Sequence, residues 1–204
     1  MAGFGAGALK LPAGQVNSYK EAMPLPKLLP LILLIASSPL LAQDAGDFAK
    51  GTRTFEFTGG YNIPIKNHQE RYILGTPALG CYLWDNFSIN LGLDGMYIYE
   101  PGSDAIGGGA NILLRWHFLH LDRLSLYGDV GGGLVELDRD APPSGTRFDF
   151  TGRAGFGATF RLKQDLYLLG GVRYFHMSNG MIWGIDRNPS FDGTQFYLGL
   201  MFSF

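Results

Sequence analysis

Residues 148–162 read Phe148-Asp-Phe-Thr-Gly-Arg-Ala-Gly-Phe-Gly-Ala-Thr-Phe-Arg-Leu162, and their side chains alternate between two kinds. The even-numbered positions carry only apolar side chains or glycine. The odd-numbered positions, counted from Arg147, carry glycine, threonine and four charged residues. Successive side chains of a strand point to opposite faces, so this pattern predicts a strand with one apolar and one charged face.

The same alternation recurs over most of the chain after Asp44, and no segment there has a convincing helical period. Six further stretches split in this way: 54–61, 87–94, 111–118, 124–130, 166–174 and 195–204. In the stretch 71–84 the alternation is blurred, and Pro77 with two glycines predicts a bulge or bend there. Together these stretches predict eight strands.

The connections between the predicted strands alternate between short and long. Short turns are predicted at 85–86, 120–123 and 163–165, and longer polar loops at 64–70, 101–107, 138–145 and 179–191. Tight turns at one end and long loops at the other are typical of outer-membrane barrels. A closed barrel also removes the strand edges that lipid does not tolerate. The sequence therefore predicts an all-β fold, an eight-stranded antiparallel transmembrane β-barrel.

A soluble lipocalin-like barrel or sandwich is the alternative, with the apolar face inside. Two features favour the membrane barrel. Aromatic residues lie near the predicted strand ends, where interfacial girdles belong: Tyr82, Trp84, Tyr97, Tyr99 and Trp116. The chain also ends in Phe204 with an apolar residue at every second position before it, which resembles the C-terminal signal of outer-membrane proteins.

The interior of an eight-stranded barrel is filled by side chains, which leaves no pore. We expect inward carboxylates and arginines to pair there in a plug of mixed sign: Glu56, Asp94 and Asp129 with Arg115, Arg153, Arg161 and Arg173. Cys81, the single cysteine, excludes an internal disulfide and is expected to be a small buried residue.

The length, net charge and N-terminal segment of the chain indicate its number of domains, its possible partners and its export. A chain of 204 residues has room for one domain. Its net charge of −2 gives no reason to expect a nucleic-acid partner. An apolar run, 28–42, follows Lys27 and ends in Ala42 before polar residues, as a secretory signal peptide does. Residues 1–42 are therefore predicted to be an N-terminal extension plus signal peptide, with Met23 as the start, and residues 43–204 the barrel domain.

Chemistry-bearing residues follow the apolar face of the seventh predicted strand. His176 and Ser178 continue the parity of Leu166, Leu168 and Tyr174, so we expect both on the lipid-facing side, at the outer-leaflet interface. A serine hydroxyl becomes a good nucleophile when a base takes its proton, and residues two apart on one face can hydrogen-bond.

Three more side chains complete this candidate site. Asp192 and Thr194 begin the last predicted strand on the same face, where an acid could orient the imidazole of His176. Asn179 follows the serine, and its side chain could donate to a developing oxyanion. The alternative is that His176 and Ser178 are ordinary polar residues of the interfacial rim.

The segment Tyr174-Phe-His176-Met-Ser178-Asn179-Gly180, followed by Asn188-Pro189 and a last strand, resembles the lipid A 3-O-deacylases of the PagL type. The resemblance implies an outer-membrane serine esterase that removes the 3-position acyl chain of lipid A, with His176 as base, Ser178 as nucleophile and Asn179 in the oxyanion hole. Family members carry a glutamate on the last strand. This chain has no glutamate after Glu136. Two positions therefore remain for the third catalytic residue beside Ser178 and His176: Asp192, which we favour, and Thr194.

The resemblance implies lipopolysaccharide as substrate, a Gram-negative outer membrane as location, and neither cofactor nor catalytic metal. The scattered His68, His117 and His120 do not suggest a ligand set, while calcium at loop carboxylates and a homodimer are left open. Two other functions also remain open. One is a non-enzymatic surface-stabilising or adhesion barrel, for which loops such as 138–145 would matter; the other is a different outer-membrane acyl hydrolase or acyltransferase.

Overall fold

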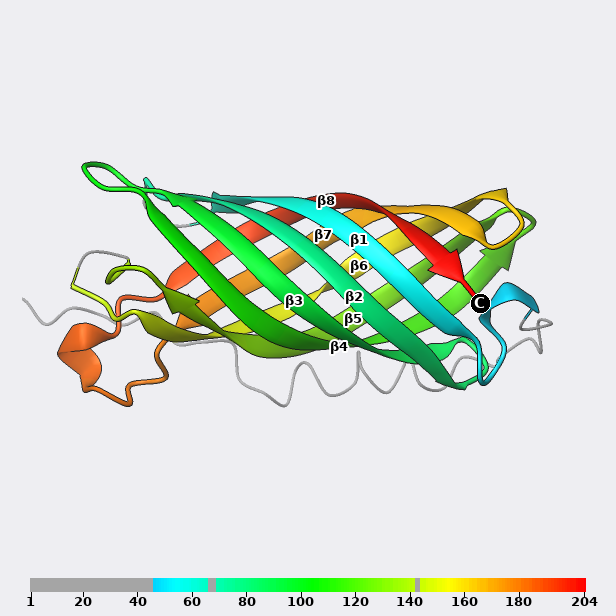
Figure 1. The fold of residues 1–204 in the computed structure, drawn as a ribbon, viewed down its shortest axis with the longest axis horizontal. Helices are drawn as coiled ribbons and strands as arrows, with labels where there is room; N and C mark the ends of the chain where they lie inside the picture. The colour runs from blue at the N-terminus through cyan, green and yellow to red at the C-terminus, as the bar shows by residue number, and fades with distance from the viewer. Residues whose placement is uncertain (1–45, 66–68, 142–143) are drawn as a thin grey trace, which may run out of the picture. The chain divides into compact units, whose positions relative to one another are not determined.

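The computed structural model describes residues 46–65, 69–141 and 144–204. These residues form a closed barrel in which eight antiparallel strands follow one another in chain order (Figure 1). The strands are β1 (Arg53–Pro64), β2 (Arg71–Trp84), β3 (Phe87–Tyr99), β4 (Ala105–Leu121), β5 (Leu124–Leu137), β6 (Phe148–Lys163), β7 (Leu166–Ser178) and β8 (Phe191–Ser203). β8 pairs with β1, for example Phe202 with Phe55, which closes the barrel. The predicted all-β, eight-stranded antiparallel barrel is confirmed.

Within the described ranges, two short 3-10 helices accompany the strands, η2 (Gly46–Phe48) and η3 (Ile185–Arg187). Over the described ranges, no helix combines the length and the apolar character needed to cross a membrane. The predicted extension and signal peptide, residues 1–42 with Met23, lie outside the described residues.

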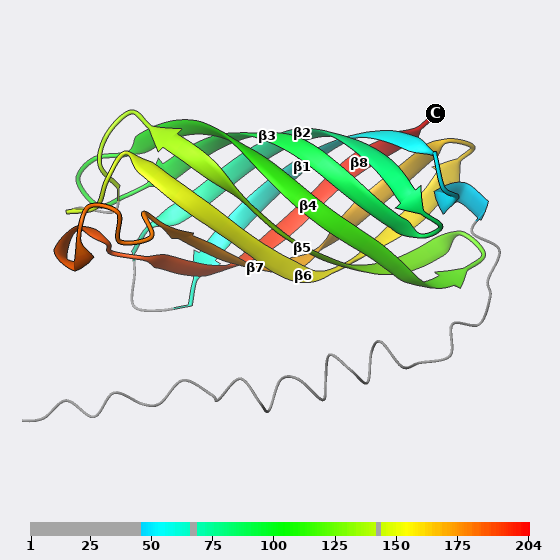
Figure 2. The same cartoon turned by 90° about the horizontal axis from the view of Figure 1, so that it is seen from below.

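The two ends of the barrel differ. One end, here the turn end, holds the short connections at 85–86, 122–123 and 164–165. The other, here the loop end, holds the connections 65–70, 100–104, 138–147 and 179–190. Figures 1 and 2 show the long connections gathered at one end, and η2 with the C-terminus at the other. The predicted alternation of short and long connections is confirmed.

The outward surface of the barrel is apolar along every strand. Many large hydrophobic side chains are exposed on it, among them Phe57, Leu79, Leu93, Ile112, Val130, Phe156, Val172 and Leu198. Their strand neighbours point inward and are buried, as the alternation within β6 predicts: Asp149, Thr151 and Arg153 are inside, and Phe150 and Phe156 outside. A water-soluble barrel has the reverse arrangement, so this surface suits a lipid environment.

The middle of the barrel interior is a network of buried ion pairs. Arg115 lies 2.7 Å from Glu56 and 3.6 Å from Asp129, which also accepts from Arg173 at 2.6 Å. The same layer holds an ion pair of Arg153 with Asp94 at 2.5 Å. Three of the four arginines predicted for this plug are therefore in it, and each opposes a carboxylate that offsets the cost of its burial.

The prediction that the fourth arginine, Arg161, lies in the plug is wrong. Arg161 lies two residues before the end of β6, and its half-exposed guanidinium meets Asp47 at 2.9 Å and Asp122 at 4.0 Å at the turn end. Inward parity alone does not bury a long side chain, because near a strand end it reaches the rim.

Apolar side chains close the interior on both sides of the charged layer. The cluster towards the loop end includes Tyr72, Leu74, Ile98, Phe175 and Phe191. The cluster towards the turn end includes Phe48, Tyr82, Tyr127, Tyr167 and Tyr197. Both clusters exclude water from the ion pairs, which strengthens each pair electrostatically.

These inward apolar layers explain why the pattern of β2 was blurred. Tyr82 was expected among the outward aromatics, but it is buried inside, with its hydroxyl 3.0 Å from Nε2 of His117. Cys81, expected to be buried, takes the outward position and is half-exposed. The irregularity of β2 falls between Tyr82 and Trp84 in its pairing with β3, while Pro77 pairs regularly with Phe57.

Candidate active site

His176 and Asp192 lie opposite each other where β7 ends and β8 begins. The β7–β8 register pairs them directly. Both side chains point outward, because the alternate positions Phe175, Met177 and Phe191 are buried in the barrel. Nδ1 of His176 consequently lies 2.8 Å from Oδ1 of Asp192.

Ser178 extends this contact into a chain of three groups. Its Oγ lies 2.9 Å from Nε2 of His176, because residues two apart on a strand share a face. With the imidazole proton on Nδ1, donated to the Asp192 carboxylate, Nε2 is free to accept from the serine hydroxyl. Ser178 is 9% exposed, whereas the His176 side chain is 37% exposed. A base positioned in this way is what a serine nucleophile requires.

Tyr174 adds a fourth group on the same face. Its hydroxyl donates to Oδ1 of Asp192, the oxygen that also faces His176. Tyr174 pairs across the ladder with Thr194, one outward position further from the loop end than the His176–Asp192 pair. Of the two residues considered as the third member, the structure therefore brings Asp192 to the imidazole, and Thr194 to Tyr174.

Asn179 is buried beneath the β7–β8 connection, at 1% exposure. Its side-chain amide donates to Oγ1 of Thr146 at 3.1 Å and to the carbonyl oxygen of Arg187. Its Oδ1 accepts from the backbone N–H of Met181 at 2.9 Å, and its own backbone N–H donates to Oδ1 of Asn188 at 3.0 Å. The amide expected to face an oxyanion is thus engaged in shaping the connection.

The backbone beyond Ser178 turns sharply. Gly180 and Met181 both have positive φ, 62° and 64°. Glycine adopts this conformation without strain, and the bond from Met181 to Asn179 holds the second residue in it. The turn places Gly180 against the ring of Phe150, the β6 residue that pairs with Ser178.

A comparison with models of known protein families matches residues 53–201 to the lipid A 3-O-deacylase (PagL) family. The chain belongs to the PagL family of lipid A 3-O-deacylases. Its barrel is located in the outer membrane, where this family resides, and the outward apolar surface faces lipid.

No curated protein matches the chain. Among solved structures, the N-terminal β-barrel domain of Pseudomonas aeruginosa OprF is 13% identical, covers 76% of this chain and 98% of its own, and has a TM-score of 0.49. A structure described as a de novo design of transmembrane β-barrels is 17% identical in sequence, with a TM-score of 0.35. The match covers 76% of this chain and 97% of the designed chain.

The sequence analysis assigned no role to three residues that contact this site in the structure: Tyr174, Thr146 and Asn188. Tyr174 and Asn188 stand in the quoted motif, and the parity that Tyr174 shares with His176 could have placed it on the same face. The contacts of Thr146 and Asn188 with Asn179 depend on the conformations of two connections. No spacing pattern in the sequence predicts contacts of this kind.

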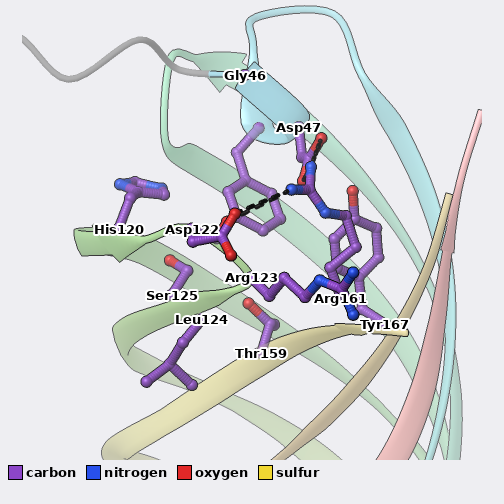
Figure 3. Close-up of a pocket in the computed structure, with 11 residues that line it drawn as sticks. Gly46, Asp47, His120, Asp122, Arg123, Leu124, Ser125, Thr159, Arg161 and Tyr167 are labelled. Carbon is purple, nitrogen blue, oxygen red and sulfur yellow. Dashed lines mark hydrogen bonds and ion pairs between the residues drawn. The ribbon is translucent and has the colours of Figure 1, made fainter. Parts of the chain in front are cut away.

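A cavity of about 120 Å³ lies at the turn end, far along the strands from His176. Figure 3 shows Arg161 between Asp47 and Asp122 beside it. Phe48 of η2 reaches into this end of the barrel and stacks on His117, with ring centroids 4.0 Å apart. The cavity is therefore part of the packing that closes the turn end of the barrel, and it is not part of the candidate active site. Within the described residues no group of three or more His, Cys, Asp or Glu side chains could hold a metal ion.

Proposed function

We propose that this protein hydrolyses the ester that links the 3-position acyl chain to lipid A, with Ser178 as nucleophile, His176 as base and Asp192 as the acid that orients the base. The observation that carries the proposal is the chain of contacts Ser178 Oγ–His176 Nε2 and His176 Nδ1–Asp192 Oδ1, at 2.9 and 2.8 Å. Membership in the PagL family supports the same reaction.

The position of the three side chains supports a lipid substrate. They point out of the barrel at the loop end, and the residues beside them on the same surface, Val172 and Phe150, are apolar and exposed. A site that opens sideways at the membrane interface meets the esters of lipids in the outer leaflet, which lie at that depth.

The reaction runs through an acyl-enzyme. Ser178 Oγ attacks the ester carbonyl carbon while His176 Nε2 takes the hydroxyl proton, and the tetrahedral intermediate expels the sugar oxygen, which receives that proton from the imidazolium. A water molecule then attacks the acyl-serine with the same base. The products are a free fatty acid and a lipid A with a free 3-hydroxyl, and Ser178 is restored.

The carbonyl oxygen becomes negative in this step and needs a hydrogen-bond donor. Among the backbone N–H groups that directly follow Ser178, those of Asn179 and Met181 are already bonded. Within the described part of the chain, the N–H of Gly180 has no hydrogen-bond partner, and we assign it this role. Asn179, the donor expected from sequence, then acts by holding the turn that presents Gly180.

Expression in a Gram-negative bacterium without such an enzyme tests the proposal. Lipid A from cells with the wild-type protein should lack the 3-position hydroxyacyl chain in mass spectra. Ser178→Ala and His176→Asn should each retain the chain, while both variants still fold as heat-modifiable barrels in electrophoresis. A folded Ser178→Ala variant that deacylates like the wild type excludes this mechanism. Release of fatty acid from phospholipid, with lipid A intact, would indicate a different acyl hydrolase.

A further inference from the structure

The β7–β8 connection carries a short apolar segment close to Ser178. This segment, residues 181–185, reads Met-Ile-Trp-Gly-Ile and contains no charged side chain. Its four large side chains are all exposed: Met181, Ile182, Trp183 and Ile185, the last at 74%. Contiguous exposed apolar side chains of this kind are typical of surfaces that contact a partner or a membrane.

The other connections at the loop end have no such segment in their sequences. Connections 100–104 and 138–147 contain no Val, Leu, Ile, Met, Phe or Trp, and connection 65–70 contains Ile65 alone. The apolar character is therefore concentrated in the connection that follows the candidate nucleophile. Figure 1 shows this connection, with η3 in orange, beyond the strand ends at the loop end.

Aromatic contacts join the apolar segment to the lipid-facing surface of β6. The rings of Trp183 and Phe148 meet edge to face, with centroids 6.2 Å apart. Phe148 meets Phe150 in the same manner at 5.4 Å. Phe150 points outward, is exposed, and pairs with Ser178. Three rings thus extend the lipid-facing surface of the barrel onto the connection.

The charged part of the same connection faces a different way. Asp186 and Arg187 follow the apolar segment directly. The guanidinium of Arg187 lies 3.6 Å from the Asp140 carboxylate and donates to the carbonyl oxygen of Gly145 at 3.3 Å. Both partners belong to the β5–β6 connection. The β7–β8 connection therefore separates an apolar part from a charged part, as amphipathic segments at a membrane interface do.

The backbone of the apolar segment is paired locally. The N–H of Ile182 donates to the carbonyl oxygen of Asn179 at 3.3 Å, and the N–H of Gly184 donates to that of Met181 at 3.0 Å. The N–H of Met181 donates to Oδ1 of Asn179 at 2.9 Å. Backbone groups that leave water need such partners, because unpaired ones are costly in an apolar environment. These turns therefore lower the cost of placing the segment against lipid.

We propose that residues 181–185 form a membrane anchor that inserts into the interfacial region of the outer leaflet beside Ser178. Lipid is the occupant of this surface, because the segment continues a surface that already faces lipid. Trp183 then joins the exposed tyrosines of the loop end, Tyr99 and Tyr174, at the depth where tryptophan and tyrosine gather in membrane proteins. The anchor itself is independent of the reaction proposed above.

Insertion of the anchor also affects the candidate active site. Met181 belongs both to the apolar segment and to the turn of positive φ that follows Ser178. Insertion therefore holds this turn, with the N–H of Gly180, at the depth of the lipid esters. This second step rests on the deacylase function proposed above.

The fluorescence of Trp183 tests the anchor in the full-length protein. The chain has three tryptophans, so Trp84→Phe/Trp116→Phe leaves Trp183 as the only one. The variant is placed in phosphatidylcholine vesicles with iodide on both sides of the membrane, or in vesicles of brominated phosphatidylcholine. Lipid brominated near the ester should quench Trp183 more strongly than lipid brominated near the chain ends, and iodide should quench it weakly.

Two further variants calibrate the quenching. Trp84→Phe/Trp183→Phe leaves Trp116 on the outward face of β4, where brominated lipid should quench it. In a background without the three native tryptophans, Arg139→Trp places the fluorophore on the half-exposed, polar β5–β6 connection. There iodide should quench it, and brominated lipid should not.

Each result for Trp183 decides the proposal. Quenching by lipid brominated near the ester supports the anchor. Quenching by iodide with none by brominated lipid overturns it. Protection from both quenchers also overturns it, and chemical cross-linking then shows whether a second copy of the chain covers the segment.

A polar double variant tests the side chains themselves and their effect on the reaction. In Ile182→Asn/Ile185→Asn the quenching of Trp183 by brominated lipid should be lost, whereas Ile182→Leu/Ile185→Leu should keep it. Release of fatty acid from lipid A in vesicles should fall about tenfold or more in the polar variant, since small displacements of reacting groups are costly. Unchanged quenching in a folded polar variant overturns the anchor. Lipid quenching in a protein that releases no fatty acid supports the anchor and contradicts the deacylase function.

Discussion

The hydroxyl of Tyr174 and the imidazole of His176 both meet the same oxygen of Asp192, Oδ1. The two donors come from one strand, two residues apart, and the carboxylate comes from the neighbouring strand. An aspartate has one methylene less than the glutamate usual on the last strand of this family. Because Asp192 pairs directly with His176, its shorter side chain still reaches the imidazole, and Tyr174 hydrogen-bonds to the same carboxylate oxygen.

The first prediction concerns Tyr174. Tyr174→Phe should lower kcat about tenfold with little change in KM, because a hydrogen bond to a charged group is worth about 1.5–3 kcal/mol and part of that orients the base. Steady-state release of fatty acid from lipid A measures both constants. Tyr99→Phe is the matched control, since Tyr99 is as exposed as Tyr174, at 46%, and lies on β3 away from the site. Equal activity of the two variants contradicts a positioning role for Tyr174.

The second prediction separates the two residues considered as the third member of the proposed triad, beside Ser178 and His176. Asp192→Asn should lower kcat by about four orders of magnitude at neutral pH, because the amide favours the wrong imidazole tautomer. Thr194→Ala should lower kcat by less than about tenfold, since Thr194 pairs with Tyr174 instead of His176. Single-turnover rates on lipid A measure both effects. The opposite order of sensitivities assigns the role to Thr194.

The number of strands, the lipid-facing surface and the outward position of His176 and Ser178 all followed from the period-two alternation. Alternation encodes which face a side chain takes, and a closed barrel uses that one variable throughout. It does not encode how far along the barrel a residue lies. Arg161 was therefore placed in the plug although it lies at the rim, and Tyr82 was placed outside because the interior is apolar near each end.

The hydrogen bonds of the Asn179 side chain could not be predicted from the sequence for another reason. Its partners Thr146 and Arg187 come from two connections whose conformations no periodic pattern describes. A side-chain amide directly after a candidate nucleophilic serine suggests a donor to the oxyanion. Asn179 is only 1% exposed, which indicates that its amide holds the surrounding backbone in place.

The third prediction follows from that burial. Asn179→Ala leaves Thr146 Oγ1, the Arg187 carbonyl and the Met181 N–H without their partner. An unsatisfied buried polar group costs about 1–3 kcal/mol, so the turn after Ser178 should loosen and kcat should fall about tenfold or more. Hydrogen exchange at the Met181 amide should speed up in parallel. Asn188→Ala, which removes one acceptor, should have a smaller effect on both. Lost activity with unchanged exchange at Met181 would instead favour a direct role of the Asn179 amide at the oxyanion.

The fourth prediction concerns the buried plug that holds the strands in place. Arg115→Met leaves Glu56 buried without its arginine, while Asp129 keeps Arg173. Breaking a buried pair in this way costs about 3–5 kcal/mol, most of it from the uncompensated charge. The double variant Arg115→Met/Glu56→Met removes both charges and should recover most of the loss. The free energy of unfolding by urea, followed by tryptophan fluorescence in phospholipid vesicles, measures these differences.

The half-exposed pair Arg139–Asp138, 3.4 Å apart at the loop end, is the control for this cycle. Arg139→Met should cost no more than about 1 kcal/mol, because water screens an exposed pair. If Arg115→Met costs as little as Arg139→Met, the plug is hydrated and the apolar layers around Tyr72 and Tyr127 do not seal it. A large loss that the double variant fails to recover would mean that Arg115 acts mainly through its packing on the Tyr127 ring, 4.4 Å from its guanidinium carbon.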